Sequence, residues 1–300
     1  MKGPFTHLLY ATDVSDNARL AGDEAVRLAR RWGARLTVVF VNTDLPLKRR
    51  WRKLPNAVEI EEALRASGLK KLEDLTAPMQ DASGVDLRFA ALEGKEAAET
   101  ILAFITEQGC DFLVIGSHGT TAMDLFSVGS VAIQLIRHSP VPVLTVRPDL
   151  EEGFQRILAP VDFSEASEAS LGLAAMMARQ ADEATLHVLH SFEPLGIASL
   201  SLVSPGQEED YRHQIVDTER EALEQFIEDA ALEGIDPVVE VICRAPDQAI
   251  LEYVEAHDID LICMGTVGRS GLSAMFVGNT AERILRGTTC SMLTTHPEQD

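Results

Sequence analysis

The sequence predicts an α/β protein made of two doubly wound, mainly parallel five-stranded sheets, each with helices on both faces. Short apolar runs of strand length alternate with helical segments, and this alternation requires parallel strands joined by right-handed crossovers. The pattern also occurs twice. The segment Gly116–Ser130 reads glycine, two residues, glycine, nine residues, glycine and serine, and its counterpart 149 positions later is Gly265–Asn279. The apolar runs that end at Asp13 and Asp162 share this offset, so a whole unit is duplicated.

The elements of the first half follow from their apolar patterns. Continuous apolar runs of strand length are typical of parallel strands buried on both faces. Apolar residues between Leu20 and Trp32 repeat at helical spacing, and Gly33 ends that helix. The expected strands are Phe5–Ala11, Leu36–Val41, Val85–Leu92, Phe112–Ile115 and Val141–Val146, and the other expected helices are Val58–Met79, Ala97–Gln108 and Val128–His138.

The second half repeats this course after a short polar linker. Its expected strands are Ile157–Pro160, Thr185–Leu189, Val238–Cys243, Leu261–Met264 and Met292–Thr294. The linker Arg147–Gly153 contains proline, glycine and acidic residues, which are typical of a turn between domains. We therefore expect one domain over residues 1–148 and a second over residues 154–300.

Composition limits the classes of partner. A formal net charge of −21 disfavours nucleic acid and anionic membrane surfaces, because both require basic faces. No apolar run reaches the roughly 18 residues of a membrane-spanning helix, so we expect a cytoplasmic protein. One basic cluster, Lys48–Lys53, follows the second strand. It is either a solvated loop, a lid over a bound phosphate or a docking patch.

The four cysteines show no metal-binding or redox spacing. Cys110, Cys243, Cys263 and Cys290 include no pair separated by two residues, and three of them lie in apolar runs. We expect them to be small buried hydrophobic residues, and we expect no metal site made of protein side chains alone.

The residues that could bind a ligand lie where strands end. In open α/β sheets, ligands bind beyond the carboxyl ends of the strands. Glycines after the fourth strand let the backbone approach an anion, and the helix that follows presents free N–H groups to it. Asp13 can accept hydrogen bonds from ribose hydroxyls or contact a divalent cation. Taken singly, Asp13 and Ser130 are ordinary helix caps and the glycines ordinary turn residues; the long fixed spacing, present twice, favours a phosphate site.

This combination resembles a tandem universal stress protein, and the resemblance covers nearly all of the chain. The family signature is similar to G-x2-G-x9-G-(S/T), which the first half fits fully. The resemblance implies an adenine nucleotide alpha-hydrolase-like fold, with the aspartate on the ribose side, the end of the second strand beside adenine, and the glycine loop on the phosphates. The implied binding residues are Asp13, Val41, Gly116, Gly119, Gly129, Ser130 and Val131 in the first half, and Asp162, Gly265, Gly268, Arg269, Gly278, Asn279 and Thr280 in the second. The adenine pocket would also include Phe40, and His190 and Ser191 in the second half.

The two copies differ. Asn279 stands where the signature has serine or threonine, although Thr280 follows it. Arg269 follows the second glycine and could reach a phosphate, whereas the first half has Thr120 there. We therefore expect two sites of unequal affinity.

The resemblance implies a cytoplasmic stress-response regulatory protein that binds ATP or AMP, with Mg²⁺ accompanying the triphosphate. A slow ATPase that uses the same pocket and a scaffold protein without a ligand are the alternatives. We expect no dedicated catalytic residue, because His118 is replaced by Val267 in the second copy and no P-loop lysine is present. His190 would be a satisfied or pocket-lining side chain. The resemblance also implies an internal pseudo-dimer through the final strands of the two halves, with an unknown protein partner and a homodimer as further expectations.

Overall fold

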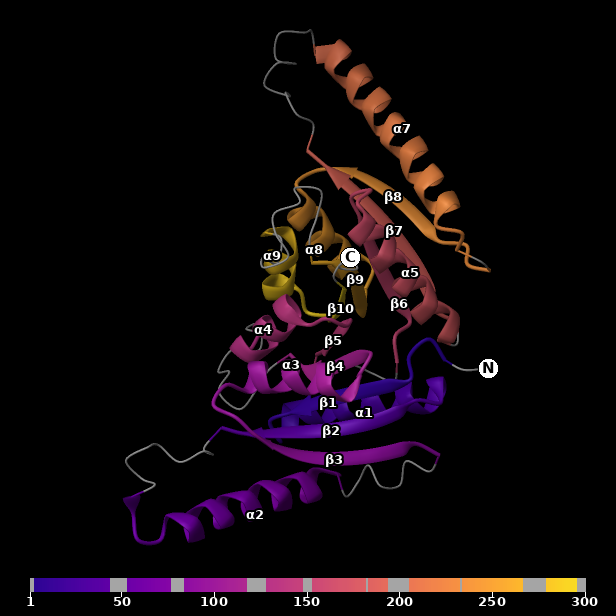
Figure 1. The fold of residues 1–300 in the computed structure, drawn as a ribbon. Helices are drawn as coiled ribbons and strands as arrows, with labels where there is room; N and C mark the ends of the chain where they lie inside the picture. Colours follow the sequence, from indigo (N-terminus) through magenta and orange to yellow (C-terminus); the bar gives the residue numbers. More distant parts are fainter. Residues whose placement is uncertain are drawn as a thin grey trace. The chain divides into compact units, whose positions relative to one another are not determined.

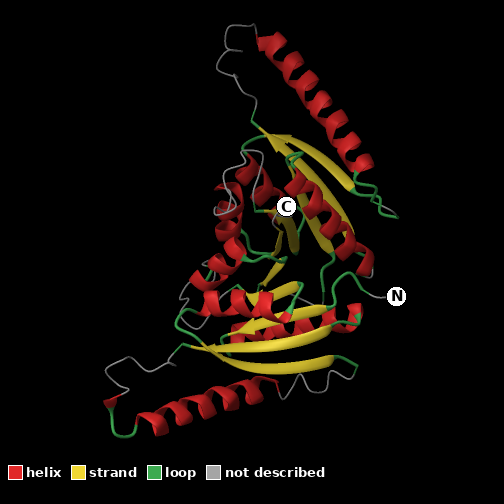
Figure 2. Cartoon of the chain, viewed as in Figure 1, coloured by secondary structure: helices red, strands yellow, loops and turns green. Residues whose placement is uncertain are grey.

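The computed structural model describes residues 3–43, 53–76, 84–117, 128–147, 153–181, 183–193, 205–232, 234–266 and 279–295. The chain divides into two compact units, Met1–Leu150 (unit 1) and Glu151–Asp300 (unit 2). Each unit is an α/β structure in which strands are flanked by helices (Figures 1 and 2). The duplicated fold class predicted above is confirmed.

Unit 1 has five parallel strands in the order β3-β2-β1-β4-β5. This is a doubly wound order, because the chain moves outward from β1 to β3 and then returns to the other side of β1. The elements are β1 (His7–Thr12), α1 (Asp16–Trp32), β2 (Arg35–Asn42), α2 (Ala57–Thr76), β3 (Asp86–Glu93), α3 (Ala97–Gln108), β4 (Phe112–Gly116), α4 (Ser130–His138) and β5 (Val143–Val146).

Unit 2 repeats this arrangement with the order β10-β9-β6-β7-β8, again all parallel. Its elements are β6 (Arg156–Val161), α5 (Glu165–Gln180), β7 (Thr185–Phe192), α7 (Pro205–Asp229), β8 (Val238–Cys243), α8 (Pro246–Ala256), β9 (Leu261–Gly265), α9 (Asn279–Gly287) and β10 (Ser291–Thr295).

Most element bounds match the expected ones within two residues, but β7 ends at Phe192, three residues beyond the expected Leu189. The final strand of unit 1 begins at Val143 instead of Val141, because Pro142 has no N–H to donate; its carbonyl accepts from the N–H of Leu113 at 2.9 Å. Helix α4 begins two residues later than expected, at Ser130. The last residues of the expected helix Val58–Met79 lie outside the described residues.

The strand registers show which residues of the two units correspond. Strands β1 and β6 correspond at an offset of 149, but in β2 and β7 the offset is 150. Thr12 pairs with Phe40 in unit 1, and Val161 pairs with His190 in unit 2. His190 is therefore the structural counterpart of Phe40, and Ser191 that of Val41.

The helices contact the sheets in the same pattern in both units. Helix α1 packs on β1 and β4, as α5 packs on β6 and β9, while α3 contacts α4 and α8 contacts α9. Helix α2 runs alongside β2 and β3, and α7 runs alongside β8 (Figure 1). Leu72 in α2 and Leu223 in α7 are both fully buried. Aligning these two leucines places Gly68 of α2 opposite Glu219 of α7, four residues earlier in each helix.

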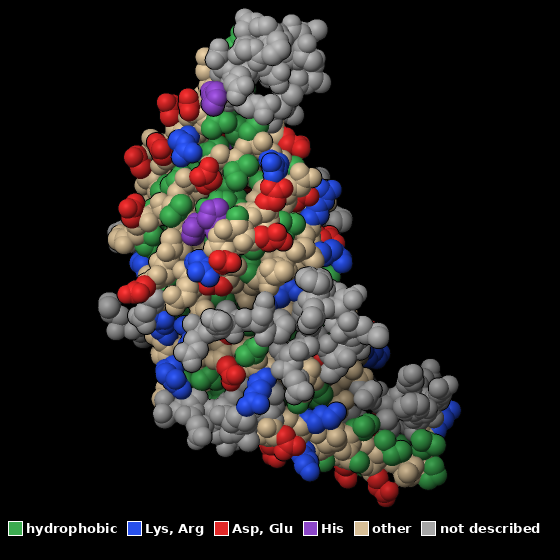
Figure 3. All heavy atoms as spheres, turned by 180° about the vertical axis from the view of Figure 1, so that it is seen from behind, with side chains coloured by type: hydrophobic (Ala, Val, Ile, Leu, Met, Phe, Trp, Pro, Cys, Tyr) green, Lys and Arg blue, Asp and Glu red, His purple; other side chains and the backbone are tan. Residues whose placement is uncertain are grey.

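Charged side chains of both signs are spread over the face shown in Figure 3. Among the described residues, no helix is long and apolar enough to cross a membrane.

Candidate functional site

In unit 1 the candidate residues after β1 and β4 meet at one edge of the sheet. Ala11 and Ile115 are register partners in these neighbouring strands, and Asp13 and Ser117 each follow two residues later. We call the edge where the carboxyl ends of the strands meet the carboxyl edge. The Asp13 side chain is exposed there, so the structure brings the aspartate and the start of the glycine-rich segment together.

The turn after β1 has an uncommon backbone conformation. Val14 has φ 63°, a left-handed conformation that is a genuine outlier for a β-branched residue. The Asp13 carboxylate accepts from the N–H of Ser15 at 3.1 Å, and Ser15 caps α1 by accepting from the N–H of Ala18 at 3.3 Å. The helix cap is therefore Ser15, and Asp13 holds the turn that leads into it.

Unit 2 repeats this turn. Phe163 has φ 62°, the Asp162 carboxylate accepts from the N–H of Ser164 at 3.2 Å, and Ser164 caps α5 by accepting from the N–H of Ser167 at 3.2 Å. Asp162 is half-buried, whereas its counterpart Asp13 is exposed. The same strained turn thus presents a carboxylate twice, with less solvent access in unit 2.

Backbone hydrogen bonds fix the two described ends of the glycine-rich segment of unit 1. The N–H of Ser117 donates to the carbonyl of Val146 at 2.9 Å, and the N–H of Gly129 donates to the carbonyl of Ser117 at 3.1 Å. These bonds hold the start of α4 at the carboxyl end of β4. Residues 118–127, which include Gly119, lie outside the described residues.

The first turn of α4 differs from the expectation for Ser130. The N-cap is Gly129, which makes no side-chain cap hydrogen bond, and Ser130 is the first helical residue with an exposed side chain. The first intrahelical bond runs from the N–H of Ile133 to the carbonyl of Gly129 at 3.1 Å. The N–H groups of the first turn, including those of Ser130 and Val131, therefore precede the helical ladder and carry the positive end of the helix dipole.

In unit 2, Gly265 serves packing. A Cβ atom added to Gly265 would lie 2.8 Å from Cβ of Ala166 and 3.0 Å from its carbonyl oxygen, so only glycine lets α5 approach β9 this closely. Thr266, the next residue, donates its N–H to the carbonyl of Thr295 at 2.9 Å. Gly268, Arg269 and Gly278 lie outside the described residues; Asn279 and Thr280 begin α9.

The end of the second strand is packed differently in the two units. In unit 1, Val41 is buried, and the Phe40 ring lies 3.5 Å from a Cβ atom built on Gly68 of α2. In unit 2, the His190 ring is buried and has polar partners on both nitrogens. Its Nδ1 lies 2.9 Å from the carbonyl of Val161, and its Nε2 lies 3.4 Å from the Glu219 carboxylate of α7. This is the satisfied side chain expected for His190.

Aromatic rings extend the contact of unit 2 across the carboxyl edge. The ring centroid of Phe163 lies 4.3 Å from that of His190 and 5.5 Å from that of Phe226 in α7, and Phe192 stacks on His190 at 5.9 Å. Sequence reasoning missed Phe163, Phe226 and Glu219. The replacement of Val14 by Phe163 was visible at the repeat offset, but nothing in the sequence indicated which residues of α7 would meet it.

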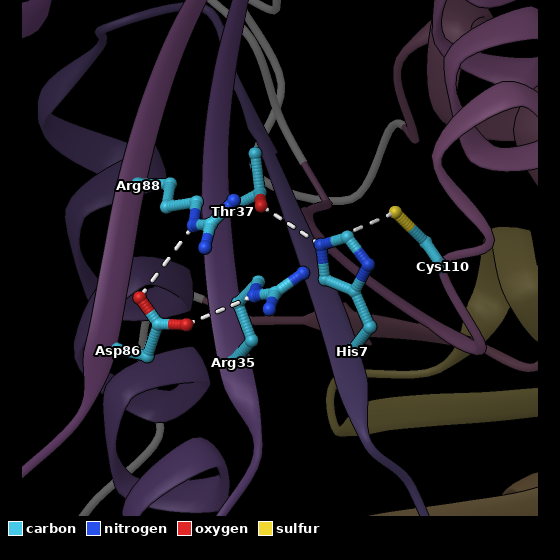
Figure 4. A network of polar contacts seen from close by, with 6 residues as sticks. All are labelled: His7, Arg35, Thr37, Asp86, Arg88 and Cys110. Carbon is cyan, nitrogen blue, oxygen red and sulfur yellow. Dashed lines mark hydrogen bonds and ion pairs between the residues drawn. The ribbon is translucent and has the colours of Figure 1, made fainter.

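A second polar network lies at the opposite, amino edge of unit 1 (Figure 4). His7 Nε2 lies 2.8 Å from the Thr37 hydroxyl and 3.8 Å from the Cys110 sulfur. Burial, with a contribution from Arg35, lowers the pKa of His7, and burial raises the pKa of Cys110 to about 11. A thiol with this pKa is a poor nucleophile at neutral pH. Figure 4 also shows the exposed ion pairs of Asp86 with Arg35 and Arg88.

Among the described residues, no group of three histidine, cysteine, aspartate or glutamate side chains could hold a metal ion. A cavity of about 580 Å³ borders α7, and its described lining residues are Tyr211, Gln214, Ile215, Thr218 and Glu219. All of these lining residues lie on one face of α7, and none of them is at the end of β6 or β9.

Comparisons with known proteins support the duplication. The model of the universal stress protein family matches twice, at residues 4–147 and 153–296. Universal stress protein Slr1230 of Synechocystis is 24% identical over 96% of this chain and 99% of its own length. The universal stress protein E homolog of Haemophilus influenzae is 27% identical, but the match covers only 55% of each chain. A solved structure of a universal stress protein from Pseudomonas aeruginosa covers 98% of this chain and 94% of its own, with a TM-score of 0.71 at 20% identity, which supports the fold alone. The chain belongs to the universal stress protein family and carries two of its domains in tandem.

Proposed function

We propose that unit 1 binds an adenine nucleotide at its carboxyl edge and that the protein acts as a nucleotide-responsive regulator in the cytoplasm. The observation that carries this proposal is the bond between the Gly129 N–H and the Ser117 carbonyl. It holds an N-terminal helix turn without a side-chain cap beside the end of β4, next to the exposed Asp13 at the end of β1. The positive end of a helix dipole and a carboxylate side by side suit a ligand that carries both phosphate and hydroxyl groups.

The order of the strands determines the direction in which the nucleotide would lie along the carboxyl edge. Strands β4, β1 and β2 are consecutive neighbours, and neighbouring strands lie about 4.8 Å apart, so their ends span roughly 10 Å. Phosphates at the start of α4 and ribose hydroxyls at Asp13 would leave the base beside Phe40 and Val41 at the end of β2. Gly116, Gly119, Gly129, Ser130 and Val131 would surround the phosphates. Mg²⁺ would accompany a triphosphate, and Asp13 is the described carboxylate placed to contact it.

The test is nucleotide binding to the full chain by isothermal titration calorimetry. Gly129 has φ −61° and ψ 147°, which any residue can adopt, so Gly129→Leu adds a side chain at the helix start without straining the backbone. Gly129→Leu and Asp13→Asn should each lower the affinity for ATP at least tenfold.

The matched control is Asp23→Asn, which removes one exposed carboxylate from α1 away from the strand end. It should leave the affinity within about twofold of the wild type. Unchanged affinity in Gly129→Leu, with circular dichroism showing an intact fold, would refute the site.

A further inference from the structure

We propose that in unit 2 the rings of Phe163, His190 and Phe226 fill the space that a nucleobase would occupy, so that unit 1 alone binds nucleotide in the wild-type protein. This inference rests on the proposed function, because it concerns which of the two copies of the site is accessible.

Strand order identifies the space in question. In unit 2 the neighbours are β9, β6 and β7, so a nucleotide with phosphates at the start of α9 and ribose at Asp162 must place its base beyond the end of β7. His190 lies at that end, opposite the last residue of β6. A ligand that extends past Asp162 therefore meets whatever covers His190.

The rings that cover His190 come from two directions. Phe163 leaves the turn after β6 and contacts His190, with 4.3 Å between centroids, and Phe226 of α7 meets the Phe163 ring edge-on at 5.5 Å. Together these contacts bridge the carboxyl edge from the turn to α7. A nucleobase would have to pack in this space, and here the protein's own aromatic rings occupy it.

The polar contact of Glu219 with His190 strengthens the closure. His190 is only 4% exposed, and both of its ring nitrogens face oxygen atoms, Val161 O and Glu219 Oε2. Glu219 and Phe226 are seven residues apart, so they lie on the same face of α7 together with the buried Leu223 between them. One helix face thus supplies a polar, an aliphatic and an aromatic contact.

Unit 1 differs at three of these positions. Val14 replaces Phe163, Phe40 replaces His190, and Gly68 replaces Glu219 at the crossing of helix and strand. A Cβ atom built on Gly68 would lie 3.5 Å from both the Phe40 ring and the Asn42 side-chain nitrogen, so this position adds no carboxylate near the base. The exposed Asp13 and half-buried Asp162 agree with this difference in access.

The first experiment uses the wild-type full chain and hydrogen exchange with and without saturating ATP. Protection should appear at the β1–α1 turn, residues 12–18, and at the start of α4, residues 129–133. It should be absent at the equivalent residues 161–167 and 278–282. Equal protection in both units would overturn the inference while supporting nucleotide binding. Absence of protection in both units would overturn the proposed function and, with it, this inference.

The second experiment removes two of the rings that fill the proposed base-binding space in unit 2. The double variant Phe163→Val, Phe226→Ala gives unit 2 the small residue that unit 1 has and removes the ring of α7. Calorimetric stoichiometry should rise from one to two ATP per chain, with new protection at residues 161–167. A folded double variant that still binds one ATP would show that the rings do not exclude the ligand, and would overturn the inference. Glu219→Gln, a milder change that retains the packing, should increase exchange in α7 at least threefold; unchanged exchange there would contradict the role of the contact between Glu219 and His190.

Discussion

Val14 and Phe163 occupy equivalent positions 149 residues apart, and both adopt a left-handed backbone, with φ of 63° and 62°. A β-branched and a bulky aromatic side chain are among the least suited to this conformation. Its presence in both copies shows that the turn after the first strand, and not the side chain, dictates the backbone. Each turn delivers an aspartate to the carboxyl edge and a serine cap to the next helix.

The first prediction concerns the strain in this turn. Val14→Gly should raise the free energy of unfolding by about 1 kcal/mol, because glycine adopts positive φ without steric cost. Phe163→Gly should lower the same quantity, because the relief of strain is smaller than the loss of its ring contacts with His190 and Phe226. Urea denaturation followed by circular dichroism measures both. A destabilised Val14→Gly would show that the valine side chain supports the turn.

The second prediction concerns the close packing at Gly265. Gly265→Ala should lower the free energy of unfolding by about 1–3 kcal/mol, since the new methyl group would overlap Ala166. Gly172→Ala is the matched control. Gly172 lies in α5, is exposed and has open space around a built Cβ atom, so alanine should be neutral or stabilise by up to about 1 kcal/mol. Equal effects of the two substitutions in urea denaturation would contradict the packing role of Gly265.

The third prediction concerns pH. Burial lowers the pKa values of His7 and His187 from 6.5, with added contributions from Arg35 at His7 and from His257 and Arg156 at His187. Below pH 6.5 the unfolded chain therefore binds more protons than the folded chain, and the free energy of unfolding falls as pH drops toward the folded pKa values. The slope is at most about 1.4 kcal/mol per pH unit for each group.

Urea denaturation between pH 7.5 and 5 tests the third prediction. The slope of unfolding free energy against pH should be smaller in His7→Gln and in His187→Gln than in the wild type. The exposed His138 provides the control, and His138→Gln should retain the wild-type slope. Identical slopes in all four proteins would rule out buried histidines as the cause.

The fourth prediction concerns the attachment of α2. Leu72→Ala should lower the free energy of local opening of α2 by about 2–4 kcal/mol, because Leu72 is 2% exposed at the contact with the sheet. In the same helix Leu69 is 46% exposed, and Leu69→Ala should change this energy by less than about 0.5 kcal/mol. Hydrogen exchange over residues 57–76 measures both. Similar effects at the two positions would contradict attachment through Leu72.

The fifth prediction concerns thiol reactivity. All four cysteines are free, and Cys243 is half-buried while the other three are buried. At pH 8 roughly one Cys110 thiol in a thousand is a thiolate, given its pKa of about 11. Iodoacetamide should therefore label Cys243 first in the native protein and all four cysteines in urea, as followed by mass spectrometry. Rapid native labelling of Cys110 would show that its site opens.

The sequence alone identified the duplication, the parallel sheets and the carboxylates after the first strands, because these depend on local hydrophobic runs and on spacing. It placed α3 at Ala97–Gln108 and β8 at Val238–Cys243, the bounds that the structure has. It misassigned the cap of α4, since the choice between Gly129 and Ser130 depends on backbone angles that the two-residue sequence does not specify. The strand-end residues named from the resemblance, Phe40 and Val41 in one half and His190 and Ser191 in the other, already lie 150 positions apart, and the registers of β2 and β7 give the same correspondence.

The tertiary structure decided what covers each copy of the carboxyl edge. Glu219 and Phe226 are distant in sequence from Phe163 and His190, and only the docking of α7 brings them together. The same docking in unit 1 places Gly68 over Phe40. Local pattern thus determined that two equivalent strand edges exist, whereas long-range packing determined how they differ, because access to a strand end depends on side chains that reach it from another element.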